Sequence, residues 1–130
     1  MKTRLAMALV VVLACSGGAN RDIANRDWKL VLLGDTSDPV GTEGKSLSLR
    51  FDSATLRAGG FAGCNSYSAS YELGAGRLTF GPAISTKMFC ESSQEVEDAY
   101  LKALESVATW ELRDGALTLR SDRGSVLLFR

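Results

Sequence analysis

The side chains that most often perform chemistry in proteins are sparse in this sequence, and one type is missing altogether. The 130 residues contain no histidine, the commonest general base and metal ligand. A serine or cysteine nucleophile activated by histidine is therefore excluded. The remaining reactive groups are the thiols of Cys15, Cys64 and Cys90. Because zinc needs about four cysteine, histidine or carboxylate ligands, the sequence predicts no metal site, and it predicts no cofactor.

Three acidic residues, Glu95, Glu97 and Asp98, cluster where a helix is expected to begin. Two carboxylates that converge in a cleft could hydrolyse a glycosidic bond, which is the main enzymatic alternative for this chain. Negative charge at a helix N-terminus is also favoured by the helix dipole. We therefore interpret the cluster as a solvent-exposed acidic face that stabilises the helix. The protein is predicted not to be an enzyme.

The glycine-rich residues 59–63 (Gly-Gly-Phe-Ala-Gly) do not form a phosphate-binding loop, because no lysine and threonine follow in the Walker arrangement. The segment is interpreted as a β-bulge or tight corner that requires positive φ. Next to it, Asn65 is interpreted as a structural residue that bonds to nearby backbone. Tyr67 and Tyr71 alternate with serines, which predicts packing at the edge of the core. The lining of a binding cleft is the alternative for these tyrosines.

The N-terminus has the pattern of a bacterial signal peptide. Lys2 and Arg4 supply positive charge, and residues 5–14 form an unbroken apolar run of ten residues. As a helix this run would rise about 15 Å, half the roughly 30 Å of a bilayer core, so it is too short to span a membrane. Residues 12–15, Val-Leu-Ala-Cys, resemble the bacterial lipobox, in which the cysteine thiol receives a diacylglycerol before cleavage. We expect removal of residues 1–14 and lipidation of Cys15; an ordinary signal peptide cut further on is the alternative.

Export to an oxidising compartment also accounts for the other two cysteines. Once Cys15 is assigned to lipid, Cys64 and Cys90 remain as an even pair and predict a disulfide. The bridge would close a loop of 27 residues and constrain the unfolded chain by ~3.5 kcal/mol on the loop-entropy model. Two buried free thiols are the alternative.

The charge balance argues against nucleic acid as a partner. Removal of Lys2 and Arg4 leaves 13 basic and 15 acidic side chains, a net charge of −2. A nucleic-acid-binding domain would show a basic stripe, and electrostatic membrane binding would need a polybasic segment. We expect the protein to reach the membrane through its acyl chains alone.

These groups have to be positioned by a small domain with mostly β structure. Residues 15–26 carry one large apolar side chain, Ile23, and are interpreted as a lipidated, flexible tether, so the folded domain is expected to span 27–130. Alternating apolar and polar residues predict short antiparallel strands, separated by turns such as Asp114-Gly115. The predicted strands are 28–33, 46–51, 66–71, 77–80, 110–113, 116–120 and 126–129.

One segment departs from the strand pattern. Ser92 and Glu95 fit a capping box, in which each side chain bonds to the backbone N–H of the other residue. A helix over about 93–106 is predicted from apolar residues at helical spacing on one face: Val96, Ala99, Tyr100, Ala103, Leu104 and Val107. The predicted fold is therefore α+β and β-rich, a curled antiparallel sheet or half-barrel of seven to eight short strands with one packed helix.

Two segments together resemble the META domain, the family of HslJ-type heat-shock lipoproteins. Residues 60–67 read Gly-Phe-Ala-Gly-Cys-Asn-Ser-Tyr, and residues 85–90 read Ser-Thr-Lys-Met-Phe-Cys. The resemblance spans about 28–129, with departures at 68–70, where the family tends to carry a glycine, and at Phe89, which replaces a small residue. It implies a compact antiparallel β domain with one helix and no established enzyme activity. The candidates for a binding role are Asn65, Tyr67, Tyr71, Thr86 and Met88.

The expected function is that of a non-enzymatic lipoprotein of the cell envelope, and the resemblance implies a link to heat, envelope stress or antibiotic tolerance through binding. Ser16 after the lipidated cysteine favours sorting to the outer membrane, facing the periplasm. We expect a monomer that is attached by its lipid. One alternative is a pilotin-like adaptor for another outer-membrane protein, which needs an exposed apolar surface. Another is a carrier of a small apolar ligand, which needs an enclosed cavity.

Overall fold

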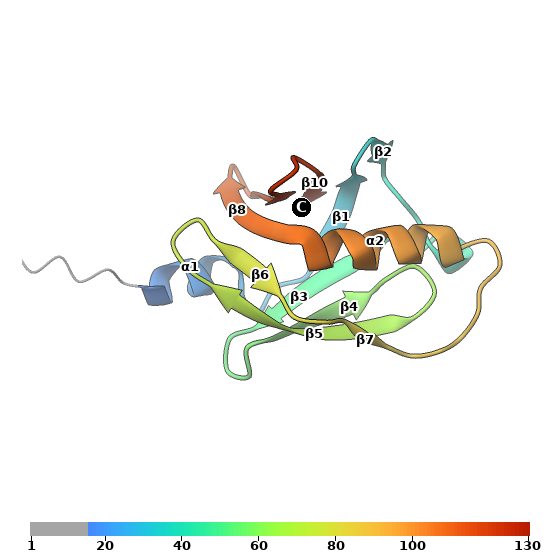
Figure 1. Cartoon of the computed structure of the whole chain (residues 1–130), viewed down its shortest axis with the longest axis horizontal. Coiled ribbons are helices and arrows are strands. Elements are labelled where there is room, and N and C mark those ends of the chain that lie inside the picture. Colours follow the sequence, from blue (N-terminus) through green and yellow to red (C-terminus); the bar gives the residue numbers. More distant parts are fainter. Residues whose placement is uncertain (1–15) are drawn as a thin grey trace, which may run out of the picture.

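The structure, a computed structural model, describes residues 16–130. Within this range the chain forms a ten-stranded antiparallel sheet and two α-helices (Figure 1). The strands are β1 (Trp28–Leu33), β2 (Thr36–Ser37), β3 (Ser48–Asp52), β4 (Arg57–Phe61), β5 (Ser66–Leu73), β6 (Leu78–Phe80), β7 (Ile84–Ser85), β8 (Val107–Arg113), β9 (Ala116–Ser121) and β10 (Val126–Phe129). The helices are α1 (Ser16–Ile23) and α2 (Gln94–Ser106), and a short 3₁₀ helix, η1, spans Thr42–Gly44.

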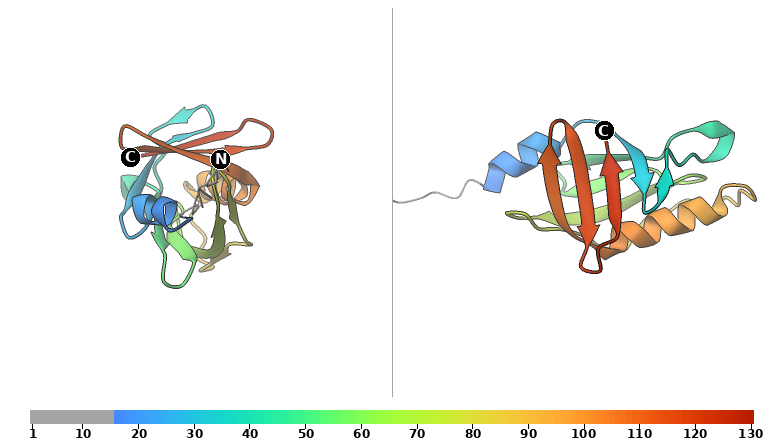
Figure 2. Two further views of the ribbon diagram at one scale, coloured as in Figure 1. Left: turned by 90° about the vertical axis from the view of Figure 1, so that its left-hand side faces the viewer. Right: turned by 90° about the horizontal axis from the view of Figure 1, so that it is seen from above.

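The sheet curls until its two ends meet, which confirms the predicted curled antiparallel sheet. The strand order is β6-β5-β4-β3-β1-β10-β9-β8, with β2 paired to β1 and β7 paired to β5. Near the two ends of this order, Arg77 and Thr109 form an antiparallel bridge. The Trp110 backbone N–H donates to Gly76 O at 3.2 Å, and Trp110 Nε1 donates to Gly74 O at 3.1 Å. The result is a nearly closed, barrel-like sheet, seen along its length in Figure 2.

Large side chains fill the interior of this barrel. Leu49 and Phe51 of β3, and Leu117 and Leu119 of β9, are fully buried, as the period-2 pattern predicts. Aromatic rings pack among them; Phe51 contacts Tyr71 edge to face, with ring centroids 5.0 Å apart. The other large buried side chains include Trp28, Leu30, Leu47, Leu78, Tyr100 and Phe129. Burial of this apolar surface is the main source of stability for the fold.

The predicted helix is present as α2, which runs along one side of the barrel (Figures 1 and 2). Tyr100 and Leu104 are buried beneath it, whereas Ala99, predicted for the same face, is exposed. The predicted capping box of Ser92 and Glu95 is wrong. The N-cap is Ser93, which makes no side-chain capping bond, and its hydroxyl oxygen lies 3.2 Å from Thr42 Oγ1 instead.

The folded domain begins earlier than the predicted boundary at residue 27. Residues 16–23 form α1 rather than a flexible tether, and Ile23 at its end is fully buried in the core. Trp28 Nε1 donates to Ile23 O at 2.9 Å, and the Tyr71 hydroxyl donates to Asn20 Oδ1 at 2.9 Å. The single large apolar residue of the presumed tether is therefore an anchor of the core. The predicted signal peptide, 1–14, and Cys15 lie outside the described residues.

The glycine-rich segment is mostly a strand, β4, which the sequence interpretation had missed. Gly59 and Gly60 pair with Ser68 and Tyr67 of β5. A Cβ atom at Gly60 would overlap Ser48 O, so the glycine permits a close approach of two backbones rather than a turn. The predicted positive φ occurs only at the end of the segment, at Gly63, where φ is 126°.

Candidate functional site

The predicted disulfide between Cys64 and Cys90 is present. Its Cα atoms are 5.8 Å apart, inside the usual range for a bridge. Cys64 follows β4 and is buried, and Cys90 lies in the connection between β7 and α2. The bridge therefore ties this connection to the turn between β4 and β5.

A buried glutamate, Glu97, contacts the backbone next to the disulfide at Cys64. Sequence interpretation placed Glu97 on an exposed acidic face with Glu95 and Asp98, and for Glu97 this is wrong: its side chain is 2% exposed, while the other two are exposed. Glu97 Oε1 accepts hydrogen bonds from Asn65 N at 2.6 Å and from Cys64 N at 3.2 Å. The three residues therefore do not share one acidic face, because Glu97 points into the core and Glu95 and Asp98 lie on the surface.

Asn65 connects Glu97 to the segment on the far side of the disulfide. Its Nδ2 group donates to Glu97 Oε2 at 2.8 Å and to Met88 O at 2.9 Å. Its Oδ1 accepts from Thr86 Oγ1 and from Met88 N, both at 2.9 Å. Every hydrogen-bonding site of the amide is used, and the residue is 3% exposed. Asn65 is therefore a structural bridge, in agreement with its predicted structural role.

These contacts hold an exposed apolar segment, which we call the apolar loop (residues 84–89). Ile84, Met88 and Phe89 are 69%, 62% and 77% exposed. The backbone of this loop is fixed at Met88 by Asn65 and at its end by the Cys64–Cys90 bridge. The connection between β7 and α2 lies at the end of the molecule opposite α1, as Figures 1 and 2 show.

Two tyrosine hydroxyls meet in the core. The hydroxyl oxygens of Tyr67 and Tyr100 are 2.7 Å apart, and they lie 2.8 Å and 3.1 Å from Ser48 O. Burial raises the pKa of Tyr67 and, well above its usual value, that of Tyr100. Both phenols therefore stay neutral at physiological pH, where they serve as hydrogen-bonding core residues rather than as acids.

The structure brings together only some of the residues predicted for binding. Asn65, Thr86 and Met88 form one hydrogen-bonded unit, and of these only Asn65 is fully enclosed. Tyr67 and Tyr71 lie in the core, away from solvent, as the core-packing interpretation predicted. Burial also raises the pKa of the Tyr71 hydroxyl, which donates to Asn20.

Three contributors to the site were missed. Ile84 and Phe89 were not selected because nothing in an isolated apolar residue shows that it is exposed. For Glu97 a signal existed: Ser93, Glu97, Tyr100 and Leu104 lie at helical spacing on one face, and all four are buried.

The chain from residue 16 onward holds no group of three histidine, cysteine or carboxylate side chains that could bind a metal ion. In the same range, no helix has the length and hydrophobicity required to cross a bilayer.

Solved structures of similar shape support the fold. A protein from Burkholderia xenovorans, determined by NMR, has a TM-score of 0.67 and 28% sequence identity, covering 99% of this chain and 96% of its own. A second NMR structure has a TM-score of 0.66 at 21% identity, covering 85% and 92% of the two chains. A DUF4847 family protein from Bacteroides vulgatus has a TM-score of 0.63 at 11% identity, covering 86% and 95%, so it is similar in fold alone.

Sequence comparison identifies the family directly. No curated protein matches the chain. The model of the META domain matches residues 21–130, which include α2, every strand, both cysteines of the disulfide and the apolar loop. This range also contains Ile23, in agreement with a folded domain that starts before residue 27. The chain therefore belongs to the META domain family.

Proposed function

We propose that this META-domain protein is a non-enzymatic lipoprotein of the bacterial outer membrane that binds another envelope protein through the apolar loop. In this proposal, binding supports tolerance to heat, envelope stress or antibiotics. The observation that carries it is the combination of exposure and rigidity at Met88 and Phe89. The apolar loop would thus serve both functions predicted from the sequence, binding of another envelope protein and stress tolerance.

The energetics favour a binding role for the loop. Large apolar side chains exposed to water gain free energy when a partner covers them, about 25 cal/mol for each Å² buried. A loop that is already fixed loses little conformational freedom on binding. The Asn65 bonds to Met88 and the bridge at Cys90 provide that preorganisation.

The position of the loop favours a protein partner over the anchoring membrane. The lipid would be attached to Cys15, next to α1, which begins at Ser16. Asn20 and Ile23 hold the end of α1 on the barrel. Because the connection that carries the loop lies at the opposite end of the molecule (Figure 1), an anchored protein would present it away from the bilayer.

The carrier alternative receives less support from this fold. The barrel interior is occupied by Trp28, Phe51, Tyr71, Tyr100 and Phe129, all buried. An apolar ligand would have to displace these side chains from a close-packed core, which costs more than it gains. An exposed apolar surface, which an adaptor requires, is present instead.

The partner can be captured with a photocrosslinking amino acid at residue 89 of the full-length protein in intact cells. The matched control is residue 56, because Leu56 is also apolar and 50% exposed but lies between β3 and β4. We expect one recurrent protein adduct from position 89 and none from position 56. The variant Phe89→Ser should abolish both a crosslink from residue 84 and stress tolerance, while it retains the thermal stability of the parent protein. Equal adducts from positions 89 and 56, or unchanged tolerance with Phe89→Ser, would contradict the proposal.

The anchor is tested separately by the intact mass of the membrane-fraction protein, before and after reduction with thiol alkylation. We expect a chain that starts at Cys15 with added acyl mass, and two alkylatable thiols only after reduction. A chain that is cut elsewhere and carries no lipid would contradict the proposed anchor, but it would not test the proposed binding by the apolar loop.

A further inference from the structure

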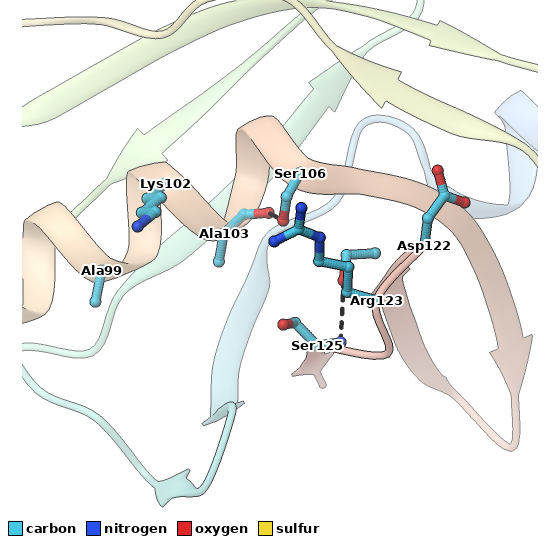
Figure 3. Close-up of a pocket in the computed structure, with 8 residues that line it drawn as sticks. Ala99, Lys102, Ala103, Ser106, Asp122, Arg123 and Ser125 are labelled. Atoms are coloured by element: carbon cyan, nitrogen blue, oxygen red, sulfur yellow. Dashed lines mark hydrogen bonds between the residues drawn. The ribbon is translucent and has the colours of Figure 1, made fainter.

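A surface groove lies between α2 and the turn that connects β9 to β10, apart from the apolar loop. Its volume is about 480 Å³, within the range of small-molecule sites. Helix α2 contributes one wall and the β9–β10 turn contributes the other (Figure 3). The lining residues are Ala99, Lys102, Ala103, Ser106, Ser121, Asp122, Arg123 and Ser125.

Small side chains keep the groove open. Ala99, Ala103 and Ser106 lie on successive turns of α2, and none is long enough to cover the space beside the helix. They give the groove a largely apolar floor.

The opposite wall has a fixed shape. In the β9–β10 turn, Ser125 N donates to Ser121 Oγ at 3.0 Å, and Ser121 N donates to Ser125 O at 3.0 Å. Gly124 has a φ of 87°, which favours glycine over residues with a side chain. These bonds therefore fix the backbone of the turn that carries Arg123 and Ser125 beside the helix.

Two cationic side chains line the groove without an acidic partner. Between residues 16 and 130, neither Lys102 nor Arg123 has a carboxylate oxygen within 4.0 Å. In Figure 3 the Arg123 side chain extends toward α2, and the Asp122 carboxylate points away from it. A guanidinium group binds carboxylates through two parallel hydrogen bonds, and the nearby Ser106 and Ser125 hydroxyls can bond to polar substituents.

We propose that this groove binds a small organic carboxylate whose body carries hydroxyl or amide groups, such as a carboxylated amino sugar. The carboxylate lies against Arg123 and Lys102, and the less polar part of the ligand lies on Ala99 and Ala103. This site is separate from the apolar loop and does not depend on the function proposed for that loop.

Arg123 also lies beside the C-terminal turn of α2, where a positive charge favours the helix dipole by about 0.3–1 kcal/mol. A purely structural role of this kind predicts lower thermal stability on substitution but no ligand binding. The experiment therefore measures binding and thermal stability on the same variants.

The test is a titration of the isotopically labelled full-length protein, followed by NMR. The probes are N-acetylmuramic acid, its carboxylate-free counterpart N-acetylglucosamine, and inorganic phosphate as an anion without an organic body. We expect saturable shifts of the Ala103, Ser106 and Arg123 amides with N-acetylmuramic acid only. Arg123→Gln and Lys102→Gln should each weaken this binding about tenfold, the loss of one charge-assisted hydrogen bond.

The matched control is Arg113→Gln, because Arg113 lies outside the groove, at the end of β8, and pairs with Glu111 at 3.4 Å. It should leave the affinity unchanged. Equal shifts with N-acetylglucosamine or phosphate, no saturation at millimolar ligand, or unchanged affinity in Arg123→Gln would overturn the proposal. A lower melting temperature of Arg123→Gln without any binding by the parent protein would assign Arg123 to the helix dipole alone.

Discussion

At the scale of single residues, Glu97 and Asn65 form the hydrogen-bonded connection between the core and the apolar loop. A buried carboxylate is costly unless hydrogen bonds replace its water. Glu97 receives these bonds from Cys64 N, Asn65 N and Asn65 Nδ2. Asn65 in turn carries the interaction to Met88. A chain of polar contacts thus links the core to the exposed loop, so the loop depends on a residue that it does not touch.

The variant Glu97→Gln tests this dependence. In this variant the amide oxygen can replace Glu97 Oε1 and accept from the backbone N–H groups of Cys64 and Asn65. The amide NH₂ group then replaces Glu97 Oε2, so that it faces the Asn65 NH₂ group and neither finds an acceptor there. We expect a loss of about 1–3 kcal/mol in the free energy of unfolding, measured by urea titration. The control Glu95→Gln, at an exposed position, should change it by less than about 0.5 kcal/mol. If the Glu97→Gln protein were as stable as the parent, the free-energy cost of burying the carboxylate would equal the stabilisation that its hydrogen bonds provide.

At the scale of elements, the end of α1 is as much a part of the domain as the barrel strands. Truncation of Ile23 to alanine should cost about 2–5 kcal/mol, because the side chain is fully buried. The same truncation at Ile84, which is 69% exposed, is the matched control and should be nearly neutral. Thermal and urea unfolding of both variants measure the difference. Equal effects of the two substitutions would restore the interpretation of residues 15–26 as a tether.

The β3–β4 pairing depends on the missing side chain at Gly60. A methyl group there would overlap Ser48 O, so Gly60→Ala should destabilise the protein by about 1–3 kcal/mol. At Gly74 the nearest atom to a new Cβ is Arg77 Cβ at 4.0 Å, so Gly74→Ala serves as the control and should be tolerated. Urea midpoints of the two variants compare them. A neutral Gly60→Ala would mean that the strands can separate slightly without loss.

Sequence analysis predicted the elements whose signals are local. Period-2 alternation identified the strands around Leu49 and Leu119, and helical spacing identified α2 almost to the residue. It failed where the decisive contact is distant in sequence. Ile23 looked like an isolated apolar residue because its partner, Trp28, becomes a partner only in the fold. Glu97 looked solvated because Asn65 lies 32 positions away.

At the candidate site, too, features with a local signal were predicted and those that depend on distant contacts were not. Pairing of the cysteines left over after lipidation predicted the disulfide, and Asn65 was correctly interpreted as structural. Exposure of Met88 and Phe89 could not be predicted, because an apolar residue after a strand is usually buried. The groove beside α2 was also invisible, since Arg123 and Ala103 meet only through the tertiary fold.

At the scale of the whole molecule, the tyrosine pair sets an alkaline limit on stability. Burial raises the pKa of Tyr67 and Tyr100 above the ordinary value of 10.0, so the folded state keeps protons that the unfolded chain loses. Their contribution to stability is therefore complete below about pH 10 and decreases as the pH rises further, by up to about 1.4 kcal/mol per pH unit for each tyrosine. Urea unfolding between pH 8 and 11 should show this decrease, and Tyr100→Phe should make it shallower. An identical pH profile for the two proteins would contradict the assignment.

The junction between α1 and the barrel has a consequence for how an anchored protein finds its partner. If Cys15 carries the proposed lipid, α1 (Ser16–Ile23) occupies most of the chain between the anchor and the core, and little is left that could act as a flexible linker. A domain on a flexible linker samples a volume that is set by the length of the linker. This one would instead slide across the membrane surface with its far end at a nearly constant height. Encounters would then be a two-dimensional search at one height above the membrane, and a partner whose binding surface lies at another height would be missed regardless of its affinity.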